Sequence, residues 1–200
     1  VTLGGSDLRQ KTELKLKNAL CATGAYEAIH YSFFSPSDLD MLRLPEDAIE
    51  RKAISLINPI NVELSLMRTT LAPQMIHAIA RNQKRGILSG RLYELGNVFI
   101  PKDLPLTEYP DERETLSVGV FGENESFFTI KGMAETVADT LDIEFEYETA
   151  AKPYLHPYQT AKIICDGDEV GYLGKISYEI KDELDMRVDG YIMEIDLKKL

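Results

Sequence analysis

The residues that could do chemistry in this 200-residue chain are three histidines and a group of basic side chains. His30, His77 and His156 lie far apart, and none has a carboxylate at metal-ligand spacing, so the sequence argues against a metal site. No Gly-x-Ser-x-Gly, Ser-x-x-Lys or Cys-His pattern indicates a nucleophile. Acids in the second half alternate with aromatic residues, which is typical of the wet face of a sheet and not of a general acid-base pair.

A basic strip is the remaining candidate for binding chemistry. Its members are Arg68, Arg81, Lys84, Arg85 and Arg91. Such a strip could face RNA or an acidic partner surface, although a net charge of -11 argues against a protein whose main task is to hold nucleic acid. The first hundred residues carry 12 basic and 10 acidic side chains, whereas the second hundred carry 10 and 23. For the acidic half, a solvated surface is the simpler interpretation.

The strip is positioned by a helix followed by a strand. Thr70 is the predicted N-cap, and Pro73 falls in the first turn, where its missing N–H costs nothing. Apolar residues recur at helical spacing at Leu71, Met75, Ile76 and Ile79. Gly86 is predicted to end the helix, and Arg91–Phe99 is predicted to form a strand.

The rest of the chain predicts further helices and strands of one sheet. A helix over Leu8–Thr23, capped by Asp7 and ended by Gly24, precedes a strand over Tyr26–Phe33 that is apolar on much of both faces. Ser35-Pro36 starts a short helix, and Asn58-Pro59 is a turn. The later elements are a loop at Lys102–Arg113, strands at Glu114–Phe121, Glu144–Glu148, Ala161–Cys165, Val170–Ile176 and Gly190–Leu197, a helix at Phe127–Leu141 and a hairpin turn at Asp166-Gly167. This pattern predicts an α+β fold, an antiparallel sheet with helices covering one side.

Composition favours one globular domain over residues 1–200. The hydrophobic content is 44%, no apolar run approaches the roughly 18 residues of a membrane span, and no signal-peptide pattern is present. Cytoplasmic localisation, with no membrane association, is the expectation. Cys21 and Cys165 have no C-x-x-C partner and are interpreted as core thiols. Because the sequence starts at Val1 with no methionine, it is expected to be either processed or cut from a longer polypeptide.

Several motifs together resemble a known family. They are Asn58-Pro59-Ile60, Glu63, MRTTLAP (67–73), RLYELGNVF (91–99), YLHPYQTA (154–161) and GYLG (171–174). In order and spacing they resemble the core-like domain of the bacterial phenylalanyl-tRNA synthetase beta subunit, which looks like a class II synthetase core that has lost catalysis. Lys175-Ile176-Ser177 departs from this family, which often has His-Pro after the second Gly of GYLG.

The resemblance implies that the chain itself is not catalytic. An active class II core has Phe-Arg-x-Glu at the end of the matching strand, whereas here Phe99 is followed by Ile100, Pro101 and Lys102. An aliphatic side chain cannot form the charge-assisted bonds that hold phosphate. The chain also has no Gly-x-Gly and no arginine after Arg187, so a second phosphate-binding arginine is missing.

The resemblance also implies partners. The order long helix, glycine, strand, Ser-Pro resembles class II motif 1, which builds the dimer interface, and the candidate interface residues are Leu16, Leu20, Tyr26, Ile29, Tyr31 and Phe33. The expected partner is the alpha subunit, in a heterotetramer of two alpha and two beta chains. ATP, magnesium and tRNA(Phe) are expected to belong to the complete enzyme, with no cofactor in this chain. The isolated chain is expected to self-associate through the same surface.

Two other functions remain open at this point. One is an active ATP-dependent adenylating enzyme on the same fold, which the missing arginines argue against. The other is a free-standing protein-interaction domain of α+β type. For Arg68, the alternatives are a surface or partner-facing salt bridge and a place beside an amino-acid pocket like that of active relatives.

Overall fold

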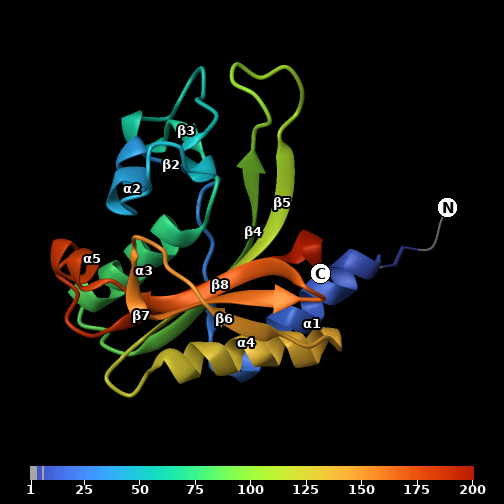
Figure 1. Cartoon of the computed structure of the whole chain (residues 1–200), viewed down its shortest axis with the longest axis vertical. Helices are drawn as coiled ribbons and strands as arrows, with labels where there is room; N and C mark the ends of the chain where they lie inside the picture. The colour runs from blue at the N-terminus through green and yellow to red at the C-terminus, as the bar shows by residue number, and fades with distance from the viewer. Residues whose placement is uncertain (1–3, 6) are drawn as a thin grey trace.

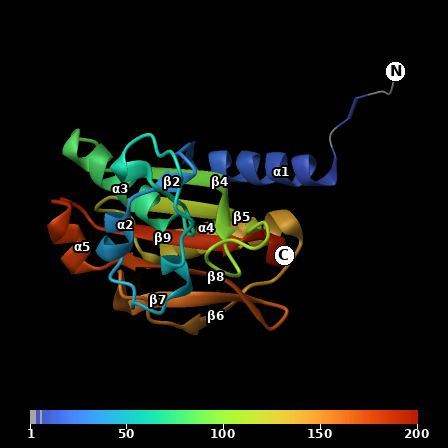
Figure 2. The same cartoon turned by 90° about the horizontal axis from the view of Figure 1, so that it is seen from above.

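A seven-stranded sheet forms the centre of the protein in the computed structural model, which describes residues 4–5 and 7–200 (Figure 1). The sheet order is β1-β4-β5-β9-β8-β7-β6, and Figure 2 shows the strands in this order from β4 to β6. Every pair is antiparallel except β1 with β4, which is parallel. The strands are β1 (Tyr26–Glu27), β4 (Gly90–Ile100), β5 (Asp111–Phe121), β6 (Glu146–Thr149), β7 (Leu155–Cys165), β8 (Asp168–Ile176) and β9 (Gly190–Asp196). A second, small sheet pairs β2 (Phe33–Phe34) with β3 (Leu66–Met67).

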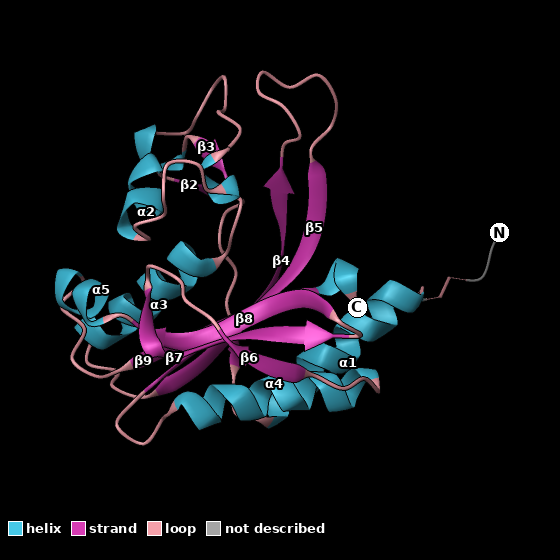
Figure 3. Cartoon of the chain, in the orientation of Figure 1, coloured by secondary structure: helices cyan, strands magenta, loops and turns pink. Residues whose placement is uncertain are grey.

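Helices cover both faces of the large sheet (Figure 3). They are α1 (Leu8–Ala22), α2 (Pro36–Met41), α3 (Ala72–Lys84), α4 (Phe127–Leu141) and α5 (Tyr178–Glu183). On one face α1 and α4 bury an apolar cluster that includes Leu116, Val118 and Met193. On the other face α2, α3 and α5 bury a second cluster, which includes Ile76, Tyr172 and Ile192. The expectation of helices on one side only is therefore wrong, because the strands carry apolar residues at both alternations.

Local sequence signals explain where the helices begin and end. The Asp7 side chain accepts a hydrogen bond from the Gln10 N–H at 2.7 Å and so caps α1, as predicted. Gly24 and Gly86 follow α1 and α3 with φ of 85° and 86°, a left-handed conformation that favours glycine. The N-cap position of α3 is Leu71 and not Thr70, but the Thr70 hydroxyl does accept a hydrogen bond from the Ala72 N–H at 3.1 Å.

Glycine also decides how closely α3 approaches the sheet. A Cβ built on Gly119 of β5 would lie 2.8 Å from Met75 Sδ and 2.9 Å from Ile79 Cδ1. A larger residue there would push the helix off the strand. This contact places Met75 and Ile79 of α3 directly over β5.

Two antiparallel connections agree with the sequence prediction. Asp166 and Gly167 have φ of 50° and 86°, which suits the tight turn between β7 and β8. The loop after Ile100 joins β4 to β5 within one sheet.

Two other predictions are corrected. The strand over Tyr26–Phe33 is not continuous, because only its first two residues pair with β4 and its end pairs with β3 in the small sheet. Cys165 is a buried thiol as expected, whereas Cys21 is exposed and lies 3.4 Å from the Tyr93 hydroxyl.

Candidate functional site

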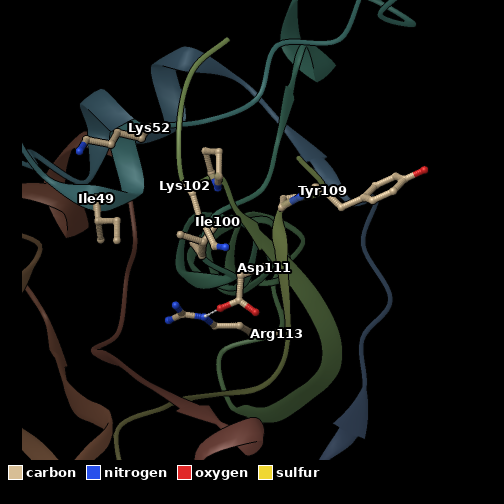
Figure 4. Close-up of a pocket in the computed structure, with 9 residues that line it drawn as sticks. Ile49, Lys52, Ile100, Lys102, Tyr109, Asp111 and Arg113 are labelled. Atoms are coloured by element: carbon tan, nitrogen blue, oxygen red, sulfur yellow. Dashed lines mark hydrogen bonds and ion pairs between the residues drawn. The ribbon is translucent and has the colours of Figure 1, made fainter. Parts of the chain in front are cut away.

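The end of β4 opens into a cavity of about 590 Å³, shown in Figure 4. Ile100 lines it, and the resemblance predicts that an active class II core has arginine at this position. Two of the three cations that line the cavity are paired with carboxylates, whereas no ion pair is formed by the third, Lys52, within the described residues. Arg113 Nε lies 2.7 Å from Asp111, and Lys102 Nζ lies 2.9 Å from Glu108. At Ile100 the cavity therefore presents an aliphatic side chain, which cannot form charge-assisted bonds to phosphate, and the guanidinium of Arg113 beside it is engaged by Asp111.

A neighbouring cavity of about 160 Å³ shares Ile100 and Arg113 and reaches Glu194 on β9. Glu194 is buried and accepts hydrogen bonds from the Tyr172 hydroxyl at 2.5 Å, from the Thr70 hydroxyl at 2.8 Å and from the Leu71 N–H. Burial raises the pKa of Glu194. The three hydrogen-bond donors and the charge of Lys152 act in the opposite direction but do not outweigh burial, so the pKa is raised overall. Glu194 thus caps the Leu71 N–H at the start of α3, beside the Thr70 hydroxyl, which accepts from the Ala72 N–H.

A third region combines exposed apolar side chains with the edge of the sheet. Tyr26 is 76% exposed, Ile29 is 86% exposed and Tyr31 is 66% exposed, and Phe33 is partly buried. Ile29, Tyr31 and Phe33, together with residues of α3, line a groove of about 920 Å³. We call Tyr26, Ile29 and Tyr31 the apolar edge. Large apolar side chains exposed together beside a sheet edge are typical of a partner surface.

Two of the predicted interface residues do not belong to this surface. Leu16 and Leu20 are 1% and 0% exposed and lie in the cluster between α1, α4 and the sheet. They face the chain's own core because they lie on the side of α1 that packs against α4. A partner cannot contact them without opening that core, so this part of the prediction is corrected.

The basic strip is not one surface. Arg81, Lys84 and Arg85 are exposed along the second half of α3 and at its end, and Lys84 lies 3.9 Å from Asp185. Arg91 points elsewhere, since its guanidinium bonds Glu125 at 2.9 and 3.2 Å and the Thr23 carbonyl at 2.8 Å.

Arg68 is buried, which corrects its placement in the basic strip. Its side chain and that of Glu94 are each 4% exposed, and Arg68 Nη1 lies 2.8 Å from Glu94 Oε1. The second Glu94 oxygen lies 2.6 Å from His30 Nδ1. Burial would raise the pKa of Glu94, but the hydrogen bond with His30 and the charge of Arg68 outweigh it, so the pKa is lowered.

Sequence reasoning missed Glu94 and Gln74 as partners of Arg68. The only signal for Glu94 was an acid between apolar residues in the middle of the predicted strand, and no sequence signal set Gln74 apart from other polar residues of the helix. Of the metal-ligating side chains within residues 4–5 and 7–200, no three or more are grouped to hold a metal ion. No helix in the described part of the chain has the length and apolar character needed to cross a membrane.

Comparison with known proteins decides the family. The family described as the phenylalanyl tRNA synthetase beta chain CLM domain matches residues 1–197. The chain belongs to this family. The phenylalanine–tRNA ligase beta subunit of Clostridium tetani is 35% identical over 98% of the chain, and that of Staphylococcus saprophyticus is 34% identical over all of it. The alignments cover 25% and 26% of those proteins, so the chain spans about a quarter of the length of its curated relatives.

The fold of this CLM domain is that of a class II synthetase. The pyrrolysyl-tRNA synthetase of Desulfitobacterium hafniense superposes with a TM-score of 0.73, over 94% of this chain and 66% of that one. A second structure from the same organism, titled PylSc, gives 0.72 over 96% and 67%. Sequence identity is 15% in both, so the likeness concerns the fold alone. The α+β prediction and the family resemblance are both confirmed.

Proposed function

We propose that the chain is a non-catalytic module of a phenylalanine–tRNA ligase beta subunit and that it pairs with the alpha subunit. Relatives of that name over the whole chain support the first part. The apolar edge carries the second, because Ile29 and Tyr31 expose large side chains beside the edge strand β1. In water these side chains favour association with another apolar surface.

The cavity at Ile100 supports the absence of catalysis in this module. Activation of an amino acid by ATP develops charge on phosphate, which class II cores stabilise with arginine. Here Ile100 offers no hydrogen bond, and Arg113 is bonded to Asp111. The purified chain is expected to show no phenylalanine-dependent ATP–pyrophosphate exchange above a mock preparation. Exchange above that level would support the alternative, an adenylating enzyme.

The remaining properties of the proposal concern the complete enzyme. ATP and magnesium would act in the alpha subunit, tRNA(Phe) would bind through the whole assembly, and two alpha and two beta chains would form a cytoplasmic heterotetramer. The isolated chain would self-associate through the apolar edge, which sedimentation at increasing concentration can measure. A complete reading frame encoding only this domain would favour a free-standing interaction domain instead.

The pairing is tested in the full-length beta chain with Tyr26→Asp and Ile29→Asp combined. Loss of copurification with alpha, and of aminoacylation, is expected because an unpaired charge buried in an interface costs several kcal/mol. The matched control is Tyr158→Asp, since Tyr158 is 90% exposed on β7, far from β1 in the sheet order. Normal pairing by the double variant, or equal loss by the control, would show that the surface is elsewhere.

A further inference from the structure

We infer that Arg68, Gln74 and Glu94 are positioning residues that hold the segment 28–33 in the conformation that receives the partner. We call these three residues the Arg68 cluster. The inference rests on the proposed function, because it deepens the role of the apolar edge. It concerns how that edge is presented and not whether it is a partner surface.

The segment leaves regular pairing soon after β1. The Ala28 N–H donates to the Tyr93 carbonyl at 2.7 Å, and no residue from 28 to 32 is assigned to a strand. Backbone groups that leave a ladder need other partners when they are shielded from water. For this segment the partners come from β3–α3 and from β4, far away in the sequence.

The Arg68 cluster supplies these partners. Gln74 Nε2 donates to the carbonyls of Tyr31 at 2.6 Å and Phe33 at 3.0 Å. The backbone N–H of Arg68 donates to the Ser32 carbonyl at 3.0 Å. Glu94 accepts from the ring of His30, as described above, and its other oxygen lies 3.4 Å from the His30 backbone nitrogen.

The cluster is itself fixed from several directions. Arg68 Nε donates to the Asn97 carbonyl at 2.9 Å, and Nη1 donates to Glu94 at 2.8 Å and to the Gln74 carboxamide oxygen at 3.1 Å. Gly96 makes room for the guanidinium, because a Cβ built there would overlap Arg68 Nη2. A guanidinium held in this way leaves the segment little freedom to move.

As a consequence, side chains within segment 28–33 alternate between the protein interior and the surface. His30 points to Glu94 and is largely buried, whereas its neighbours Ile29 and Tyr31 are exposed. A surface held in its bound conformation loses less conformational entropy when the partner binds. A buried ion pair contributes little net stability compared with apolar packing, so fixing one conformation is the better physical reason for burying Arg68 and Glu94.

The test uses the full-length beta chain with purified alpha subunit and a pair of matched variants. Gln74→Ala removes the donors to Tyr31 and Phe33. Gln83→Ala is the control on the same helix, because the Gln83 carboxamide also ties backbone, at Arg187 and Val188, away from the segment. Gln74→Glu repeats the test with the side-chain shape kept and the donor lost.

Two readouts separate positioning from stability and from direct contact. Hydrogen exchange of the peptide covering residues 28–34, measured in the free beta chain, should accelerate in both Gln74 variants and not in Gln83→Ala. Affinity for alpha should fall roughly tenfold or more in the Gln74 variants, because the segment is no longer held in its bound conformation and must be ordered when alpha binds.

Each other outcome overturns the inference. Unchanged affinity in the Gln74 variants would show that the segment needs no support, and equal weakening by Gln83→Ala would reduce the effect to general stability. Weaker binding with unchanged exchange would mean that Gln74 contacts alpha directly. Failure of the proposed function is distinct, because then the Tyr26 and Ile29 double variant would pair normally whatever the exchange of the segment.

Discussion

Gly96→Ala is expected to destabilise the domain far more than its size suggests. A Cβ at this position would overlap the Nη2 atom of Arg68, so the guanidinium must leave its place. The displacement breaks the 2.8 Å ion pair with Glu94 and the 2.9 Å hydrogen bond to the Asn97 carbonyl. Both charged side chains are 4% exposed, so water cannot replace the lost partners without opening the site.

The magnitude follows from the burial of the pair. Removing one partner of a buried ion pair costs about 3–5 kcal/mol, because the other charge is left without compensation. Replacing a glycine by alanine where no clash occurs returns about 0.4–1 kcal/mol through the unfolded chain. A net loss of about 2–4 kcal/mol should lower the melting temperature of a chain of this size by roughly 4–16 °C.

Thermal and urea unfolding of wild type, Gly96→Ala and a control measure this loss. The control is Gly132→Ala, since a Cβ on Gly132 of α4 meets nothing within 4 Å. It should stabilise the chain by up to about 1 kcal/mol, the usual gain from alanine in a helix. If Gly96→Ala is as stable as this control, the Arg68 site adapts freely and the reasoning about its rigidity is refuted.

The pH dependence gives an independent check on the same pair. The pKa of Glu94 is lowered in the folded state, with His30 and Arg68 together outweighing burial. Its contribution to stability is therefore present above the ordinary pKa of glutamate and is lost as pH falls through the lowered value. The stability difference between wild type and Gly96→Ala should shrink on acidification across that range. A difference that stays constant with pH would show that Glu94 is not involved.

Three further predictions concern other parts of the molecule. Burial raises the pKa of Glu194, so the folded state holds the proton of this carboxyl more tightly than the unfolded state does. The free energy of unfolding should therefore fall as pH rises from the ordinary glutamate range through the raised pKa. Glu194→Gln should remove this pH dependence, and an unchanged slope of stability against pH would contradict the assignment. Asp7→Ala should cost about 1 kcal/mol in urea unfolding by removing the cap of α1, whereas a neutral result would mean that this helix start frays. The purified chain should bind tRNA only weakly and without specificity, because its acidic second half repels the polymer; sub-micromolar affinity at physiological salt in a filter assay would refute this.

The fold was largely predictable from local signals. The helix predicted at Phe127–Leu141 has these bounds in the structure, and the Asp166-Gly167 turn follows from turn chemistry. The strands predicted at Glu114–Phe121 and Ala161–Cys165 are present but begin earlier, at Asp111 and Leu155. The failure at Tyr26–Phe33 has a clear cause. Its apolar alternation resembles a strand, but its partner β4 accompanies only the first residues, and side chains replace the ladder after that.

The candidate site was predictable only where exposure follows from local pattern. Ile29 and Tyr31 are exposed as an interface would require. Leu16 and Leu20 are also large apolar residues, but they are buried in the core because α4 packs against them. Arg68 is the opposite case, because it is buried although its residue type predicts exposure. An arginine is normally placed at the surface from sequence, and only the meeting of β4 with the segment before α3 reveals its buried partner.

The first turn of α3 connects the two regions that the family resemblance singled out. At its start no residue of the helix caps it, and Glu194 from β9 accepts the Leu71 N–H and the Thr70 hydroxyl, where the positive end of the helix favours a carboxylate. Three residues after Leu71, Gln74 holds the segment that carries Ile29 and Tyr31. The buried carboxylate beside the Ile100 cavity thus anchors the helix that presents the apolar edge. If the proposed pairing holds, the cavity region has a structural role in partner presentation that does not depend on binding phosphate.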